Sequence, residues 1–186
     1  NTPEAKTNDF KWFPFAEVLY EATEQYKFYA GIDGGVQLNS YANLLQQNPF
    51  LVSDLVLKPT ETKYHFYFGL KGDIDQELKY DVKAGFSDLK NVQFFRANDL
   101  FDYNNTLNRS AYNFANTFSA VYDDGTLSEV KGNLQYFPLQ NLVIDAELHY
   151  MKFNLKNLNE VYYKPVLQST FGAKYSLLDR KLNLGF

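Results

Sequence analysis

The clearest pattern in the chain is an alternation of apolar and polar residues across residues 63–87. The first half reads KYHFYFGLKG and the second half reads LKYDVKAGFS, with a few residues around 73–77 between them. A period of two over about ten residues predicts extended strands with one apolar face and one polar face. We therefore predict a β-hairpin here, closed by a tight turn.

The same period returns along most of the chain. Residues 41–47 (YANLLQQ) have the composition of a short helix, and a helix over residues 15–26 is an alternative to the first strand, because EVLYEATEQY holds good helix formers. An Asp-Gly pair within residues 123–126 predicts a hairpin turn. Outside the first hairpin, strands are predicted at residues 10–20, 26–39, 112–122, 127–136, 142–150, 165–177 and 182–186. Residues 1–9 predict a polar connector. A long irregular segment is predicted at residues 40–62, an Asn-rich loop at residues 100–111 and a polar loop at residues 151–164.

The order of turns and loops predicts one further strand. The turns after residues 20, 72, 136 and 177 are all short and polar. In a membrane barrel, short turns lie on one side and longer loops on the other. All four turns fall on one side only if another strand lies between residues 87 and 112, and residues 92–98 are the candidate. This gives about ten strands, an even number.

Strand length and aromatic placement favour lipid as the solvent of the apolar face. The alternating runs match the ~9–11 residues that a tilted strand needs to cross a bilayer. Aromatic residues gather at the ends of the apolar faces, as in interfacial girdles. A soluble lipocalin-like carrier of an apolar ligand stays an alternative, because its alternation in sequence would be the same. The predicted girdle residues are Tyr64, Tyr80, Phe86, Tyr112, Tyr122, Tyr136, Tyr150 and Tyr175.

The predicted fold is all-β: an antiparallel up-and-down transmembrane β-barrel. Residues 10–186 form the barrel domain or a fragment of a larger barrel. The predicted lipid-facing residues are Tyr64, Phe66, Phe68, Leu70, Tyr80, Val82, Phe86, Leu134, Ile144, Leu148, Phe171 and Tyr175. The predicted lumen-facing residues, which would set selectivity, are Lys71, Asp81, Lys83, Glu129, Lys131, Asp145 and Glu147.

Composition and charge exclude several classes of function. The net charge is −4, from 18 basic and 22 acidic residues spread along the whole chain, so we expect no nucleic-acid partner, which would need a basic stripe. The chain has no cysteine, which removes thiolate catalysis and cysteine-ligated metal sites. It also has no apolar run of about 18 residues, so no transmembrane helix is expected.

No catalytic, metal or cofactor motif is recognised in the sequence. His65 and His149 both fall on the polar face and look isolated, without a second ligand at metal spacing. Asp145 and Glu147 share a face, but a polar lumen wall explains them better than a hydrolytic carboxylate pair. The glycines in GIDGG (residues 31–35) predict a bulge or bend rather than a phosphate-binding loop. We therefore predict a protein that is not an enzyme and has no cofactor.

Four segments resemble the C-terminal strands of Bacteroidota outer-membrane barrels of the TonB-dependent-receptor-like type. The resemblance covers residues 10–186 and lies in strand texture and turn spacing. No plug domain or TonB-box-like segment is recognised in these residues; in a longer polypeptide those parts would lie upstream. Phe186 resembles the terminal aromatic that barrel-assembly machinery recognises, or the sequence stops within a strand. The segments are GIDGGVQLNSYANLLQQNPFL, KYHFYFGLKGDIDQELKYDVKAGFSDLKNVQFFRAND, FSAVYDDGTLSEVKGNLQYFPLQNLVIDAELHYMKF and YYKPVLQSTFGAKYSLLDRKLNL.

The resemblance implies transport or uptake of a small solute or nutrient across a bacterial outer membrane. The expected partners are the lipid bilayer and other outer-membrane or periplasmic subunits. A structural or accessory barrel subunit of a larger outer-membrane complex is the second expectation, and the soluble lipocalin-like carrier is the third.

Overall fold

The computed structural model describes residues 10–23, 25–53, 55–75, 77–98, 116–177 and 182–185. The predicted connector at residues 1–9, the predicted loop at residues 100–111, the predicted turn at residues 178–181, Tyr112 and Phe186 lie outside the described residues.

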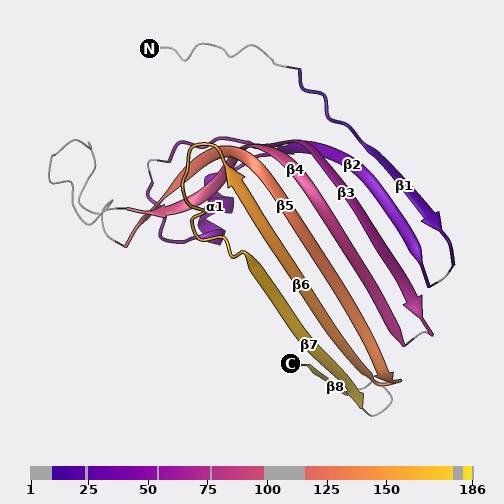
Figure 1. Ribbon diagram of the computed structural model, residues 1–186. Helices are drawn as coiled ribbons and strands as arrows, with labels where there is room; N and C mark the ends of the chain where they lie inside the picture. Colours follow the sequence, from indigo (N-terminus) through magenta and orange to yellow (C-terminus); the bar gives the residue numbers. More distant parts are fainter. Residues whose placement is uncertain are drawn as a thin grey trace, which may run out of the picture.

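The described residues form one sheet in which every strand pairs antiparallel with its neighbours in sequence (Figure 1). This confirms the predicted all-β, antiparallel up-and-down fold, and the sheet is open, with β1 and β8 at its two edges. The strands are β1 (Ala16–Glu21), β2 (Lys27–Gln37), β3 (Thr60–Ile74), β4 (Leu78–Ala97), β5 (Phe118–Leu139), β6 (Leu142–Leu155), β7 (Leu167–Leu177) and β8 (Leu182–Gly185).

The alternation in the sequence sets the register of the strands. In the β3–β4 hairpin, Phe66 lies opposite Phe86 and Leu70 lies opposite Val82. Because side chains alternate between the two faces, these pairs bring the apolar residues of neighbouring strands to a single face.

The predicted strand number is wrong, because two strands are longer than the alternation indicated. Residues 92–98 do not form a separate strand: β4 runs through them after a register shift between Leu89 and Val92. The predicted hairpin turn at residues 123–126 is also wrong, because β5 continues through it. Gly125 pairs with Leu89 on one side and Leu155 on the other, so this Asp-Gly pair lies inside the sheet.

Each of these two errors adds one strand to the predicted number. Because two added strands leave the direction of every later strand unchanged, the predicted order of turns and loops is not affected. The strands β1, β3, β5 and β7 all finish at one end of the sheet, as the spacing of turns predicted. We call this end the turn end. The strands β2, β4 and β6 finish at the other end, which we call the loop end (Figure 1).

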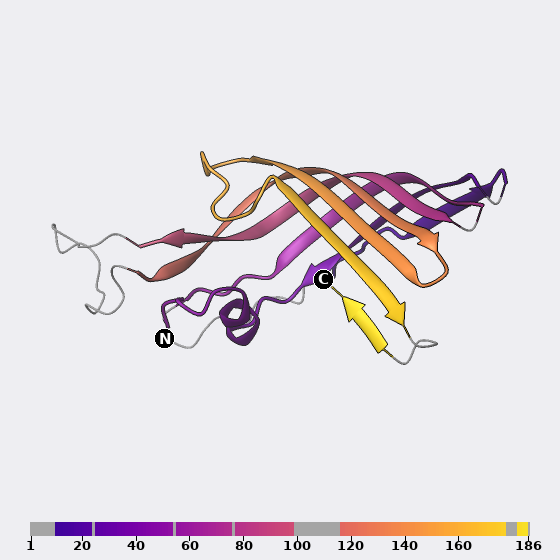
Figure 2. The same ribbon diagram turned by 90° about the horizontal axis from the view of Figure 1, so that it is seen from below.

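The only helix in the described residues lies in the β2–β3 connection at the loop end. α1 (Tyr41–Gln47) is the predicted short helix, and the side chain of Ser40 caps it by accepting a hydrogen bond of 3.2 Å from the backbone N–H of Asn43. The alternative helix at residues 15–26 is wrong, because β1 occupies the middle of that range and pairs antiparallel with β2. Figure 2 shows the sheet as an arch with α1 and β8 beneath it.

Candidate functional site

One face of the sheet carries a continuous apolar band, which we call the outer face. All the predicted lipid-facing residues share this face, as the strand registers show. Several of them project freely: Phe68 is 67% exposed and Phe171 is 74% exposed. Large apolar side chains with such exposure are not the core of a protein in water, since burial in a core is what stabilises them there.

The opposite face, which we call the inner face, is polar over the same length of strand. Lys71 lies opposite Asp81, Lys83 lies opposite Lys131, and all the predicted lumen-facing residues are on this face. The inner face is the concave one, because side chains two strands apart meet there and the α1 connection lies on the same side, beneath the arch (Figure 2).

At three glycines of the inner face, Gly31, Gly69 and Gly85, side-chain contacts reach across the strand that carries the glycine. The hydroxyl of Tyr29 on β2 donates a 2.5 Å hydrogen bond to Asp81 on β4, passing over Gly69 on β3. A Cβ atom at Gly69 would overlap the Tyr29 ring. The Nζ atom of Lys71 lies 5.2 Å from the centroid of the same ring, a cation–π distance.

A second contact of this kind joins β1 to β3. The hydroxyl of Tyr67 donates a 2.7 Å hydrogen bond to Glu17, and it crosses β2 at Gly31. A Cβ atom at Gly31 would overlap the Tyr67 hydroxyl. Since Lys83 lies 5.2 Å from the Tyr67 ring centroid, the tyrosine is held by an acid on one side and a base on the other.

The third contact brings the two histidines to one carboxylate. Nε2 of His65 on β3 lies 3.4 Å from Glu129 on β5, across Gly85 of β4, and Nε2 of His149 on β6 lies 2.8 Å from the same carboxylate. Nδ1 of His65 lies 3.1 Å from Asp33. The prediction that the histidines are isolated is therefore wrong. The glycine between them was the signal that sequence reasoning missed.

Asp145 and Glu147 each have their own partner on β5. The side-chain amide of Gln135 donates a 2.7 Å hydrogen bond to Asp145, and Lys131 forms a 2.9 Å ion pair with Glu147. This is the arrangement of a polar wall. Within the described ranges, no group of three or more His, Cys, Asp and Glu residues is arranged to hold a metal ion.

The polarity of the two faces reverses toward the loop end of the strands. On β4 the outer face changes from Phe86, which is 41% exposed, to Asp88, while the inner face changes from Ser87 to a buried apolar series. Phe94 in that series is only 1% exposed. On β6 the outer face changes from Tyr150 to Lys152. The buried series with its partly buried apolar neighbours is Leu89, Val92, Phe94, Val121, Leu127, Phe153 and Leu155.

The β6–β7 connection covers this loop-end core. Leu158, Val161 and Tyr162 from the connection pack against it. Phe94 and Phe153 meet edge to face, with ring centroids 5.7 Å apart. At the loop end, the strands therefore have the organisation of a protein in water, with an apolar inner face and a polar outer face.

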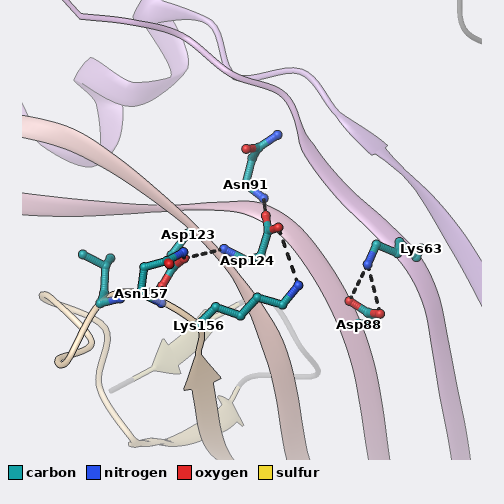
Figure 3. A network of polar contacts seen from close by, with 8 residues as sticks. Lys63, Asp88, Asn91, Asp123, Asp124, Lys156 and Asn157 are labelled. Atoms are coloured by element: carbon teal, nitrogen blue, oxygen red, sulfur yellow. Dashed lines mark hydrogen bonds and ion pairs between the residues drawn. The ribbon is translucent and has the colours of Figure 1, made fainter.

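Asp123 holds the covering connection in place (Figure 3). Its carboxylate accepts hydrogen bonds from the backbone N–H of Leu158 at 2.7 Å and from the backbone and side-chain amides of Asn157 at 2.8 and 2.7 Å. Burial alone raises the pKa of the Asp123 carboxyl, but hydrogen bonds from Leu158, Asn157 and Asp124 outweigh burial and hold it below its ordinary value. The sequence prediction missed this role by assigning Asp123 to a turn.

Asp124 performs a matching role for the irregular part of β4 (Figure 3). Its carboxylate accepts a 2.9 Å hydrogen bond from the backbone N–H of Asn91, which lies at the register shift and has a φ of 53°. Its backbone carbonyl accepts from the N–H of Lys156 at 2.9 Å. The two acids therefore stabilise a bulge and a loop on either side of β5.

The β2–β3 connection also crosses the loop end. Leu51 forms an isolated parallel bridge with Phe118 of β5, and hydrogen bonds of 3.0 and 2.9 Å link Phe118 to Val52 and Phe50. Leu51 and Val52 are buried. Both this connection and the β6–β7 connection are thus fixed to the strands rather than hanging free.

The predicted aromatic girdles fit the band in most positions. Tyr80 and Tyr136 lie on the outer face near the turn end, and the Tyr80 hydroxyl donates a 2.6 Å hydrogen bond to the backbone carbonyl of Gln25. Phe86 and Tyr150 lie where the polarity reverses. Tyr122 is an exception, because it lies beyond the reversal, in the loop-end part of β5.

Comparison with solved structures places the fold among outer-membrane receptors and transporters. The copper transporter OprC matches with a TM-score of 0.52 and 17% identity over 87% of this chain. The pyoverdine outer membrane receptor FpvA from Pseudomonas aeruginosa PAO1, bound to pyoverdine, matches with a TM-score of 0.56 and 15% identity over 93% of this chain. The FpvAI–pyocin S2 complex matches with the same TM-score and identity, also over 93%.

The chain spans 23%, 22% and 24% of the length of the OprC, FpvAI and FpvA chains, respectively. No family model matches the sequence. No curated protein sequence matches it either. No helix in the described ranges is long and apolar enough to cross a membrane.

Proposed function

We propose that this chain forms part of the wall of a transport barrel in a bacterial outer membrane. The outer apolar band faces lipid and the inner polar face lines a lumen through which a small solute or nutrient is taken up. The observation that carries this proposal is the reversal of polarity along β4, β5 and β6. If the outer face met the same solvent along the whole strand, it would keep the same polarity from end to end, so the reversal favours lipid at one part of the strand and water at the other.

The height of the band supports a bilayer as that solvent. On β6 the band runs from Leu142 to Tyr150. At ~3.3 Å per residue this covers roughly 26 Å along the strand, and a tilt of ~40° leaves roughly 20 Å across the membrane. Outer-membrane barrels have an apolar band of about 25 Å. Polar outer-face residues such as Lys152 begin directly beyond it.

The fold shared with OprC and FpvA supports the outer-membrane location and the transport class. The origin of the chain in Bacteroidota is also part of the proposal and is supported by its strand texture. Since the chain spans under a quarter of the OprC chain, a larger barrel would complete the wall, and the neighbouring strands or other outer-membrane or periplasmic subunits would meet the edges of β1 and β8. No catalytic role is part of the proposal.

The predicted lumen-facing residues are proposed to set selectivity. Lys71, Lys83 and Asp81 gather beside a pocket of about 370 Å³ on the inner face. A solute that passes along this face would meet fixed charges of both signs, held in position by the contacts across Gly31 and Gly69.

An accessory barrel subunit is the second candidate function. It is favoured by the pairing of inner-face groups with one another, as in the ion pair of Lys131 with Glu147, and by the loops that cover the inner face at the loop end. Single-channel conductance of the intact protein in a planar bilayer separates the two functions: solute-dependent conductance supports transport, and a silent barrel supports the accessory role. The lipocalin-like carrier is disfavoured, because its apolar face would line the concave side.

Membrane insertion tests the proposal directly. The intact protein is folded into phospholipid vesicles and its insertion is followed by the heat-dependent shift of folded barrels on gels. Phe68→Arg places a charge in the band and should block insertion, since such a charge costs about 2–4 kcal/mol at mid-bilayer. Lys71→Gln on the inner face of the same strand should insert as the wild type does. A wild-type protein that stays monodisperse and monomeric without detergent would refute the proposal.

A further inference from the structure

A pocket of about 510 Å³ lies at the loop end, in a part of the sheet that the contacts across glycines do not use. Its walls come from the β2–β3 connection, the ends of β4 and β5, and the β6–β7 connection. This volume is in the range of sites for small organic ligands. The walls are largely aromatic, made by Phe50, Phe94, Phe95, Phe118, Tyr162 and Tyr163.

Lys164 is the charged residue among those that line this aromatic pocket. Its Nζ atom lies 5.0 Å from the ring centroid of Phe94 and 5.3 Å from that of Phe153, so it is held against two aromatic faces. Burial lowers the pKa of the Lys164 ammonium. No carboxylate of the described residues pairs with it, and a desolvated cation without an ion-pair partner attracts an anion.

Tyr163 gives a second, independent sign of a binding site. Its φ is 54°, in the left-handed region that costs a bulky residue free energy, and its side chain is exposed. The ring packs edge to face on Phe118 with centroids 5.3 Å apart. The strained backbone therefore presents an aromatic ring at the pocket, next to Lys164 in sequence.

The two connections that frame the pocket are fixed before any ligand arrives. Asp123 holds the β6–β7 connection through Asn157 and Leu158, and the backbone hydrogen bonds of Phe118 hold the β2–β3 connection. A site whose walls are already ordered pays little ordering entropy on binding.

We propose that this pocket binds a small aromatic carboxylate, with the carboxylate on the Lys164 ammonium and the ring between the aromatic walls. The inference rests on the proposed function, because it assigns a solute class to the loop end of the proposed lumen. A cationic solute would be repelled by Lys164. A neutral aromatic solute would leave the ammonium unpaired.

Binding of 2-naphthoate to the intact protein in detergent micelles tests the proposal, measured by calorimetry against a micelle blank. Saturable binding is expected, and Lys164→Gln should weaken it at least tenfold, because a charge-assisted hydrogen bond is lost. Lys164→Arg should retain binding. Lys152→Gln, on the outer face of β6, should leave the affinity unchanged. The uncharged analogue 2-naphthamide should bind the wild type at least tenfold more weakly than 2-naphthoate does.

Three outcomes would overturn the inference: no saturable naphthoate binding, equal binding by Lys164→Gln, or equal binding of naphthoate and naphthamide. The vesicle assay of the same proteins keeps the two proposals apart. Insertion without naphthoate binding refutes only the proposal that the pocket binds an aromatic carboxylate. Failure of the wild-type protein to insert refutes the proposal of a membrane barrel.

Discussion

The two ends of β4, β5 and β6 have opposite polarity on the same continuous strands. Near the turn end, Val82 and Leu134 are exposed on the outer face and charges occupy the inner face. Near the loop end, Val92 and Phe94 are buried on the inner face and Asp88 and Lys152 lie on the outer face. The comparison shows that amphipathic alternation alone does not tell which face is the core; the solvent on each side decides.

The reversal of polarity between the two ends arises from small changes in the strands. On β4, a register shift between Leu89 and Val92 adds residues around Asn91 that have no partner on β5. On β5, the apolar residues move from the outer face at Val130 to the inner face at Leu127, without a register shift. The unpaired backbone of Asn91 is satisfied by Asp124, so the shift leaves no unsatisfied backbone N–H at that point.

The largest effect is expected from removing a loop-end core residue. Phe94→Ala should lower the free energy of unfolding by about 3–5 kcal/mol, because the side chain is fully buried and leaves a cavity. Urea unfolding of the vesicle-inserted protein gives the value. Phe68→Ala, on the outer face of the band, should cost about 1.5–3 kcal/mol, because it loses the transfer of the side chain from water to lipid but leaves no cavity. Equal losses at the two positions would remove the distinction between the ends.

Removing the charge of Asp123 should have the next largest effect. Asp123→Asn should cost about 1.5–3 kcal/mol, since hydrogen bonds to a charged acceptor are lost. Faster amide hydrogen exchange at Asn157 and Leu158 would locate the loss in the β6–β7 connection. Unchanged exchange at both amides would show that Asp123 does not hold this connection.

The pH dependence of that connection follows from the lowered pKa of Asp123. A carboxyl with a folded-state pKa below its unfolded value, ordinarily 3.8, contributes stability that is fully present above about pH 4. This stability is lost as the pH falls through the folded-state pKa. Exchange protection at Leu158 should therefore fall below about pH 4 in the wild type, and Asp123→Asn should lack this step.

A smaller effect is expected at the glycines of the inner face. Gly69→Ala should cost about 1–3 kcal/mol, because its Cβ would overlap the Tyr29 ring and displace the hydrogen bond to Asp81. Gly132→Ala is the matched control, since its Cβ would meet no atom within 4 Å. Unfolding in urea compares the two variants. A neutral Gly69→Ala would mean that the contact across β3 does not constrain the sheet.

Alternation in the sequence predicted which residues of the band share a face, because alternation and strand pairing carry the same information. The sequence prediction failed at Asp123 and Gly125, where local turn preference was outweighed by contacts with residues far along the chain, such as Leu89 and Leu155. Gly125 is needed because the backbone of Asn154 passes so close that a Cβ would overlap it. No local pattern reveals such a neighbour.

The inner-face contacts were equally hidden from sequence reasoning. His65, Glu129 and His149 lie on three different strands, and their meeting depends on the register across Gly85. The individual polar residues were predictable, but their pairing was not. The lipid and lumen assignments of the two faces stay predictions.

The central claim is that the outer face meets lipid in the band and water at the loop end. The most direct test measures which solvent surrounds successive outer-face positions on β5. The chain has no cysteine, so single cysteines at Leu134, Val130, Thr126 and Asp124 accept a spin label at one known site each. In vesicles, the account predicts that labels at Leu134 and Val130 are relaxed by oxygen, which concentrates in lipid, and that labels at Thr126 and Asp124 are relaxed by a water-soluble nickel complex. Preferential relaxation by the nickel complex at all four positions would contradict it.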